Sequence, residues 1–158
     1  MVIFLSLMAF ATCLVAGVFY AFSDFVMRAL GGLPMPQGAA AMVSINRVIL
    51  RASFVPLLLV LGPLALGVAF WIFWAGSPQG AGWVFLASGV YCVGVLGVTM
   101  LGNVPMNNRL DRADDPAKYW PTYLTHWTRL NTVRTLAAGI ASLCYLQAAL
   151  AIGTHPLT

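Results

Sequence analysis

The sequence has very little charge. Among its 158 residues, 8 are Lys or Arg and 4 are Asp or Glu, so charged side chains make up 8% of the chain. Soluble globular domains carry roughly 25% charged residues. The composition therefore argues against a water-soluble fold, and the length suits one domain over residues 1–158.

The chain also lacks the side chains that build disulfide frameworks and common metal sites. Its three cysteines, Cys13, Cys92 and Cys144, are odd in number and lie in apolar stretches, so we interpret them as packing residues. No His-x-x-His, Glu-x-x-His or paired-cysteine motif occurs, and His126 and His155 fall on opposite sides of the predicted membrane. We therefore expect no metal and no bound cofactor, although a haem with His126 as its single axial ligand stays open.

Long apolar runs dominate the sequence instead. Four uncharged runs cover about residues 2–22, 52–74, 82–102 and 135–153. Each has the ~20 residues that a helix needs to cross a hydrocarbon core of ~30 Å. The runs are apolar on all sides rather than at alternate positions, which favours helices over a β-barrel. We predict an all-α fold, a four-transmembrane-helix bundle in a single integral membrane domain.

The basic residues are confined to two connections. Three lie between the first and second runs and five between the third and fourth: Arg28, Arg47 and Arg51, then Arg109, Arg112, Lys118, Arg129 and Arg134. Because cytoplasmic loops collect Lys and Arg, both connections should face the cytoplasm and both termini should lie outside it. We expect a protein of the bacterial inner membrane, with a hydrophobic small molecule or a lipid as partner and no nucleic acid.

The second of these connections, residues 102–134, holds most of the polar side chains. From Lys118 onward its pattern is helical, because Trp120, Trp127, Asn131 and Arg134 recur at spacings of seven, four and three on one face. The residues just before it are typical of a cap and a helix start: Asp114, Asp115 and Pro116. We predict an amphipathic cytoplasmic connection between helices 3 and 4 whose last helix runs directly into the fourth span.

Arg134 is the most informative single residue. It enters the membrane with the fourth span, where a charge costs ~2.5–3.5 kcal/mol at a helix centre and less near the interface. Such charges tend to point into the bundle and to mark functional sites, although an interfacial anchor is the alternative. Trp120 and Trp127 could sandwich an aromatic ligand. Neutral donors and acceptors that could orient it gather near the same membrane face: Asn46, Asn103, Asn107 and Asn131.

Two side chains are candidates for a proton acceptor. Histidine is a common general base in proteins, so His126 is a candidate, although a lone interfacial histidine can equally be structural. Asp24, at the end of the first span, is either a partly desolvated carboxylate facing a cavity or the ion-pair partner of Arg28 on the same helix face. The sequence leaves both alternatives open.

Four segments form a pattern that extends over nearly the whole chain. They read G-V-F-Y-A-F-S-D-F-V-M-R-A-L from Gly17, M-V-S-I-N-R-V from Met42, N-V-P-M-N-N-R-L from Asn103, and W-x6-W-T-R-L-N-x2-R-T from Trp120. Together they resemble the anthrone-oxygenase-like family of small four-helix integral membrane proteins, largely a domain of unknown function. The family often has proline where Arg28 stands here. The resemblance implies oxidation of anthrones to anthraquinones without metal or flavin, and it implies these site residues: Asn103, Asn107, Trp127, Asn131 and Arg134.

Two functions from different classes fit the sequence. The first is a membrane-embedded, cofactor-independent monooxygenase, an oxidoreductase that uses O2 on a hydrophobic aromatic substrate of the anthrone or quinol type. The alternative is a non-enzymatic accessory or structural subunit of a larger membrane complex, or a protein that binds a lipid, quinone or pigment. A homo-oligomer and a larger complex both stay open.

The oxygenase hypothesis assigns roles to particular side chains. His126 or Asp24 would take a proton from the substrate. The developing oxyanion would be held by Arg134 with Asn103 and Asn107. Because buried polar groups need partners, we expect the polar residues at the matching ends of all four spans to converge on one cavity near the cytoplasmic membrane face. These residues are Asp24, Asn46, Asn103, Asn107, Trp127, Asn131 and Arg134.

The predicted topology can be tested by cysteine labelling from outside the cell, in a chain whose native cysteines are replaced. Val2→Cys should react with a membrane-impermeant reagent and Asp115→Cys should not, because Lys and Arg mark the cytoplasmic side. Labelling at position 115 alone would show that the topology is inverted.

Overall fold

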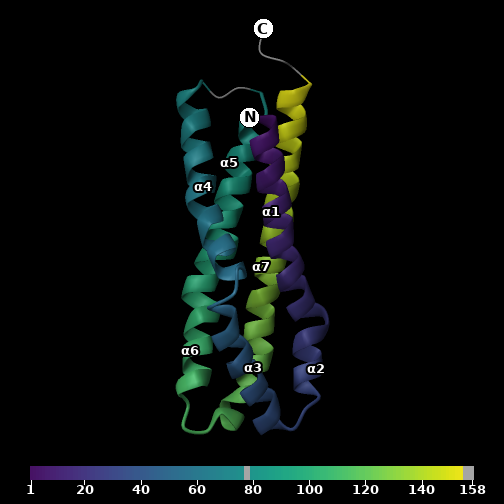
Figure 1. Ribbon diagram of the computed structural model, residues 1–158, viewed down its shortest axis with the longest axis vertical. Helices are drawn as coiled ribbons and strands as arrows, with labels where there is room; N and C mark the ends of the chain where they lie inside the picture. The colour runs from purple at the N-terminus through teal and green to yellow at the C-terminus, as the bar shows by residue number, and fades with distance from the viewer. Residues whose placement is uncertain (77–78, 155–158) are drawn as a thin grey trace.

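The computed structural model describes residues 1–76 and 79–154, which form an elongated bundle of helices (Figure 1). The described residues contain no strand, which confirms the all-α fold class. The described residues contain four long apolar helices, and each belongs to a rod that runs along the long axis. Each rod runs opposite in direction to the one before it (Figure 1).

The α-helix of each of the first two rods is interrupted part-way along its length, by a π-helical turn in rod 1 and by a turn in rod 2. Rod 1 consists of α1 (Val2–Ala21), the π-helical turn η1 (Phe22–Val26) and α2 (Met27–Gly31). Rod 2 consists of α3 (Met35–Ile49) and α4 (Phe54–Trp74), which are separated by a turn at residues 50–53. Pro36 lies in the first turn of α3, where the missing N–H has no intrahelical acceptor to lose.

The other two rods hold the longest continuous helices of the described residues, with 32 and 38 residues. Rod 3 consists of α5 (Ala81–Val90), the π-helical turns η2 (Tyr91–Gly97) and η3 (Thr99–Asn103), and α6 (Val104–Arg112). Rod 4 is the single helix α7 (Pro116–Gly153). Asp115 caps α7, because its Oδ1 accepts a hydrogen bond of 3.2 Å from the Ala117 N–H. The predicted helix start is thereby confirmed.

Four helices are long and apolar enough to cross a membrane: Val2–Gly31, Phe54–Trp74, Ala81–Arg112 and Pro116–Gly153. This confirms the predicted four-helix bundle. Three of these helices extend well beyond the predicted spans 2–22, 82–102 and 135–153, because hydropathy marks only the apolar part of a helix and the polar residues beyond continue it. The predicted amphipathic connection between helices 3 and 4 is therefore α6 and the first part of α7, joined by residues 113–115.

One half of the bundle is apolar both inside and outside. Its core lies between α1, α4, α5, η2 and α7, and small residues such as Ala138 and Ala141 let the rods approach closely. Its outer surface exposes large apolar side chains such as Ile3 and Phe70, as expected of a lipid-facing surface. Exposed tryptophans flank the turn at the far end, as in an interfacial aromatic belt: Trp71, Trp74 and Trp83.

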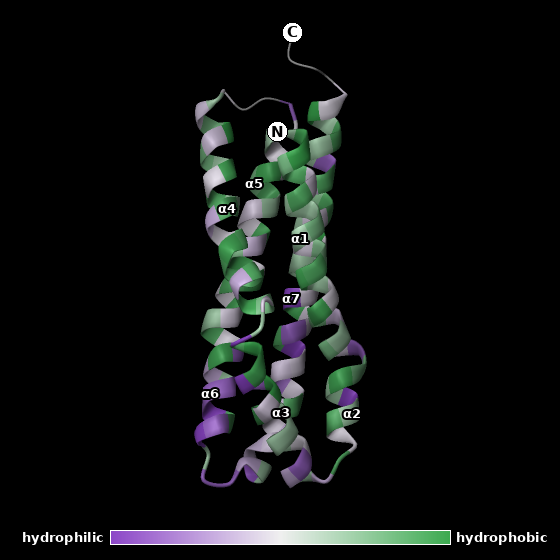
Figure 2. Ribbon diagram, viewed as in Figure 1, coloured by the Kyte–Doolittle hydropathy of each residue, from purple (hydrophilic) through white to green (hydrophobic). Residues whose placement is uncertain are grey.

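The other half of the bundle is polar on its surface. Hydrophilic residues gather on α6, on the first part of α7 and around the ends of α2 and α3 (Figure 2). A second core lies inside it, formed by α2, α3, α6 and α7, with Met27, Met42, Leu110, Trp120 and Tyr123 among its buried members. Both basic connections lie at this end, and Met1 lies at the opposite end (Figure 1). His155, predicted to lie on that opposite side, is outside the described residues.

Two glycines of rod 3 differ sharply in their surroundings. A Cβ added to Gly94 would lie 2.6 Å from Ala137 Cβ of α7, whereas a Cβ added to Gly89 would meet no atom within 4 Å. The close contact between η2 and α7 therefore depends on the missing side chain of Gly94.

This difference yields a matched pair of variants. Gly94→Ala should lower the free energy of unfolding by roughly 1–3 kcal/mol, the usual cost of overpacking a well-packed core. Gly89→Ala should leave it unchanged or raise it slightly, because alanine is the better helix former. Denaturant unfolding of both variants in detergent micelles measures the difference, and equal stabilities would contradict the close contact.

Candidate functional site

A cavity of about 310 Å³ lies where the two cores meet. Its lining includes Phe19 and Leu58 from the apolar core and Met42 from the second core. The volume falls at the lower end of the ~300–1,000 Å³ of small-molecule sites. Six of the predicted site residues line it, from α3, η3, α6 and α7: Asn46, Asn103, Asn107, Trp127, Asn131 and Arg134.

Arg134 is a buried residue of the cavity lining, with a relative exposure of 5%. Its Nη2 donates a hydrogen bond of 2.7 Å to Asn131 Oδ1, and its Nη1 donates one of 3.3 Å to Thr99 Oγ1. Its guanidinium carbon lies 4.2 Å from the ring centroid of Phe19 and 5.3 Å from that of Trp127. The guanidinium is therefore held by neutral hydrogen-bond acceptors and aromatic rings.

No carboxylate of the described residues pairs with Arg134. The ion pairs in this part of the chain join Arg28 to Asp24, Arg47 to Asp111, and Lys118 to Asp115. The Nε of Arg134 is also buried without a hydrogen-bond partner. A buried cation without an anionic partner is costly, because desolvation is only partly repaid by neutral acceptors. The cavity is therefore electrostatically complementary to an anion.

Asn131 fixes the position of Arg134 and connects α7 to rod 1. Its Nδ2 donates hydrogen bonds of 2.6 Å to the Phe19 carbonyl and 2.7 Å to Ser23 Oγ. Ser23 lies in η1, and Phe19 lies one turn before it. π-Helical turns are rare and often lie at functional sites. Here the end of α1 and the turn η1 each supply one acceptor to the Asn131 Nδ2, so the Asn131 amide is oriented with its oxygen toward Arg134.

Asn107 is oriented by two neighbouring side chains of α7. Its Oδ1 accepts hydrogen bonds of 2.7 Å from Trp127 Nε1 and 2.7 Å from the Tyr123 hydroxyl. The Tyr123 oxygen in turn accepts a bond of 3.4 Å from Asn46 Nδ2. These bonds fix which end of the Asn107 amide is the donor, and they join α3, α6 and α7 on one side of the cavity.

Asn103 is the third asparagine of the cavity lining, and it contacts the backbone of α7. Its Nδ2 donates a hydrogen bond of 3.2 Å to the Trp127 carbonyl, and its Oδ1 is buried without a partner. The cavity lining therefore contains one buried donor, Arg134 Nε, and one buried acceptor, Asn103 Oδ1, that the described residues leave unpaired. Such groups are uncommon in folded proteins and call for a ligand, a water molecule or a small rearrangement.

Trp120 contributes to the site through stacking rather than by lining the cavity. Its ring is stacked on Tyr123 with centroids 5.7 Å apart, and Tyr123 is stacked on Trp127 with centroids 5.9 Å apart. Trp120 is buried in the second core. Trp127 is itself held by this stack and by its hydrogen bond to Asn107, so its ring forms a fixed wall of the cavity.

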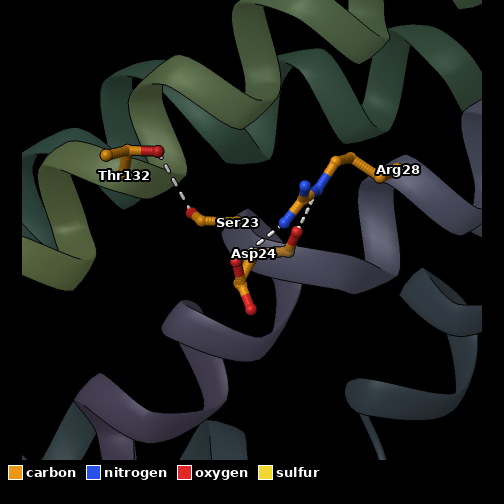
Figure 3. Close-up of polar contacts among 4 residues, drawn as sticks. All are labelled: Ser23, Asp24, Arg28 and Thr132. Carbon is orange, nitrogen blue, oxygen red and sulfur yellow. Dashed lines mark hydrogen bonds and ion pairs between the residues drawn. The ribbon is translucent and has the colours of Figure 1, made fainter.

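The two predicted proton acceptors lie away from the cavity. Asp24 is not part of the lining, and its carboxylate pairs with Arg28 at 2.8 Å (Figure 3). Arg28 Nε also donates to the Asp24 carbonyl oxygen. The expectation that Asp24 converges on the cavity is wrong, because the i,i+4 spacing lets Arg28 hold it at the surface, where its side chain is 44% exposed. His126 is an exposed residue of α7 and does not line the cavity.

Five polar side chains at the cavity were missed by the sequence analysis. Four line it, namely Arg47, Thr99, Asn108 and Asp111, and Tyr123 orients Asn107. A sequence signal existed for Thr99 and Asp111, because they are spaced four residues from Asn103 and Asn107 and form one polar stripe with them along rod 3. Tyr123 lies between Trp120 and Trp127 on the predicted inner face of α7.

One family model matches more than half of the chain. The model described as anthrone oxygenase matches residues 47–144 of the chain. The protein belongs to the anthrone oxygenase family. The matched range contains the cavity residues of η3, α6 and α7, whereas Phe19 and Asn46 fall outside it. Comparison with curated proteins and with solved structures gave no match.

The described part of this anthrone oxygenase family member holds no group of three or more His, Cys, Asp or Glu side chains placed to bind a metal ion. The cavity lining offers arginine, asparagine, threonine and aromatic side chains instead, together with one aspartate at its edge. The absence of a metal or cofactor stays a prediction, for which metal analysis of the purified protein is the direct measurement.

The contacts of Arg134 predict an order of stabilities. Asn131→Leu should lower the free energy of unfolding by roughly 1.5–3 kcal/mol, the contribution of a hydrogen bond to a charged group, because it leaves the buried guanidinium without its closest acceptor. Arg134→Met should cost less, because replacing a buried charge by an apolar side chain is often neutral or stabilising. Denaturant unfolding in micelles measures both, and the reverse order would mean that the charge serves stability.

Proposed function

We propose that the protein is a membrane oxygenase that oxidises a hydrophobic aromatic carbon acid, of the anthrone type, with O2 inside this cavity. The observation that carries the proposal is the buried Arg134, which faces the cavity side of the bundle without a carboxylate partner. Membership of the anthrone oxygenase family supports the same reaction class.

The chemistry needs a base and a place for negative charge. Removal of a C–H proton from an anthrone gives an anion whose charge lies on the ring oxygen, and such an electron-rich anion can transfer an electron to O2 directly. In this proposal Arg134 stabilises that oxyanion, with Asn103 and Asn107 as neutral neighbours in the cavity lining. The overall reaction converts the CH2 group and O2 into a carbonyl group and one molecule of water.

The surroundings of the cavity support a substrate that arrives from the bilayer. Three apolar residues of its lining are also exposed on the outer surface: Leu50, Leu59 and Met100. They come from the α3–α4 turn, α4 and η3, so the cavity has an apolar rim. The lining also contains two exposed polar residues of α6, Asn108 and Asp111. An apolar molecule dissolved in the membrane can reach the apolar rim without crossing water.

Cofactor independence is part of the proposal, as is a cytoplasmic position of the polar half. The competing hypothesis of an accessory subunit predicts a protein partner that copurifies in a fixed ratio. The oxygenase hypothesis predicts that the isolated protein consumes O2 and anthrone in equal amounts and forms anthraquinone.

The role of Arg134 can be measured with purified protein and anthrone as the substrate. Arg134→Ala should lower turnover by about 10²–10³, the loss typical of one oxyanion donor. Arg134→Lys should restore only part, because an ammonium lacks the planar fork of a guanidinium. As a control, Arg129→Ala on the exposed face of α7 should retain wild-type turnover.

Two outcomes would contradict the proposal. Activity that a chelator abolishes and a single metal restores would rule out the metal-free mechanism. An absence of anthrone oxidation in the wild-type protein, together with a stoichiometric protein partner, would favour the accessory subunit.

A further inference from the structure

The cavity opens sideways on the outer surface of the bundle. Leu50, Leu59 and Met100 belong to its lining, and these residues are also 70%, 48% and 58% exposed. Leu59 and Met100 lie in two helices that are long and apolar enough to cross a membrane. The cavity is therefore continuous with the lipid-facing surface. We call the opening between these three residues the portal.

The packing of rods 2 and 3 explains why the cavity opens here. Within the described part of the chain, α4 packs against α5 and η2, and α3 packs against α6. The turn η3, which lies between η2 and α6, packs closely against α7 but against neither α3 nor α4. Rod 2 has its own interruption between α3 and α4, at residues 50–53. The two rods therefore separate at η3, and the portal lies in this separation.

The portal lies close to the polar groups of the cavity. Met100 directly follows Thr99, whose hydroxyl accepts a hydrogen bond of 3.3 Å from Arg134 Nη1. Trp127, whose ring is 5.3 Å from the guanidinium carbon of Arg134, belongs to the same lining. A ring that lies against Trp127 with an oxygen atom at Arg134 is thus at the same level of rod 3 as the portal.

The size of the cavity limits what fits inside it. Its volume of about 310 Å³ is at the lower end for small-molecule sites, so a ring system leaves little room for a long substituent. An apolar tail that passes through the portal stays in contact with lipid instead. Because lipid tails are as apolar as leucine, such a tail has similar surroundings before and after the ring binds.

We propose that the portal is a tail-binding subsite, through which an apolar tail on the substrate extends into the bilayer while its aromatic ring occupies the cavity. The inference rests on the proposed function, and it extends the substrate class to oxygen-bearing aromatic rings with an alkyl or prenyl tail. Leu50, Leu59 and Met100 are then the residues that determine specificity for the tail.

The dependence of binding on tail length tests the subsite. Wild-type protein is placed in lipid nanodiscs that contain 4-ethylphenol or 4-hexadecylphenol at the same mole fraction of the lipid. Native mass spectrometry measures the fraction of protein that carries each phenol. Wild-type protein should bind the two phenols equally well within a few-fold, because the long tail remains in the bilayer.

Two variants narrow the portal from its two sides. Leu59→Trp should weaken the binding of 4-hexadecylphenol by about 10–100-fold, the usual cost of overpacking expressed as an affinity, and leave 4-ethylphenol within a few-fold. Met100→Trp should give the same pattern from rod 3, so the inference stays testable if either variant fails to fold.

Each of these variants has a matched control. Leu66 follows Leu59 by seven residues, about two helical turns, and is also exposed on α4, but it is not part of the lining. Leu101 is the exposed neighbour of Met100 outside the lining. Leu66→Trp and Leu101→Trp should bind both phenols as the wild-type protein does. Arg134→Met should weaken both phenols by the same factor, because it removes the contact to their shared oxygen.

Three results would overturn the tail-binding subsite. The first is a wild-type protein that binds 4-ethylphenol and rejects 4-hexadecylphenol, which would show a closed cavity. The second is binding of 4-hexadecylphenol that Arg134→Met leaves unchanged, which would show a tail bound without its ring. The third is a phospholipid of the nanodisc bound in place of either phenol, which would show that the portal holds membrane lipid.

The binding measurement needs no turnover, so the two proposals can fail separately. Binding that is independent of tail length, in a protein that does not oxidise anthrone, would overturn the proposed function and keep the subsite. Anthrone oxidation by a protein that rejects 4-hexadecylphenol would overturn the subsite alone.

Discussion

The burial of one positive charge is the constraint on which the site depends. Arg134 lies between the two cores, and neutral groups must compensate for its lost hydration. Asn131, Thr99 and two aromatic rings supply that compensation from rods 1, 3 and 4. Because these elements converge on one guanidinium, the packing of the bundle and the electrostatics of the cavity are coupled.

The apolar and polar halves of the bundle use different kinds of hydrogen bond. In the apolar half, side-chain hydroxyls bond to backbone carbonyls across rods, as when Tyr91 donates to the Leu58 carbonyl at 2.9 Å. Such bonds satisfy polar groups where water is scarce. In the polar half, side chains bond to one another, as in the group of Asn46, Asn107 and Tyr123. The first arrangement anchors the rods, and the second orients donors and acceptors around the cavity.

Much of the fold was predictable from the sequence, because transmembrane helices have a length and an apolar composition that can be read directly. The inner face of α7 was also predictable: Trp127, Asn131 and Arg134 recur with the helical period and do face the cavity. The positions of the acidic side chains depend on tertiary contacts, which the sequence does not show. The spacing of Asp24 allowed either a cavity or an ion pair with Arg28, and only the packed structure shows the ion pair. The ion pair of Asp111 with Arg47 likewise joins residues far apart in the sequence, and only the packing of α3 against α6 shows it.

The π-helical turn η3 carries a further consequence for how this chain tolerates changes in length. A π-helical turn accommodates one residue more than an α-helical turn. Loss of a single residue from this turn, such as the outward-facing Leu101, would convert it into an α-helical turn and leave the residues that follow on the same face of the rod. The same loss from an α-helical turn would rotate all that follows by about 100°. Asn103, Asn107 and Asp111 would therefore still face α7, so a one-residue deletion does less damage within η3 than within α6.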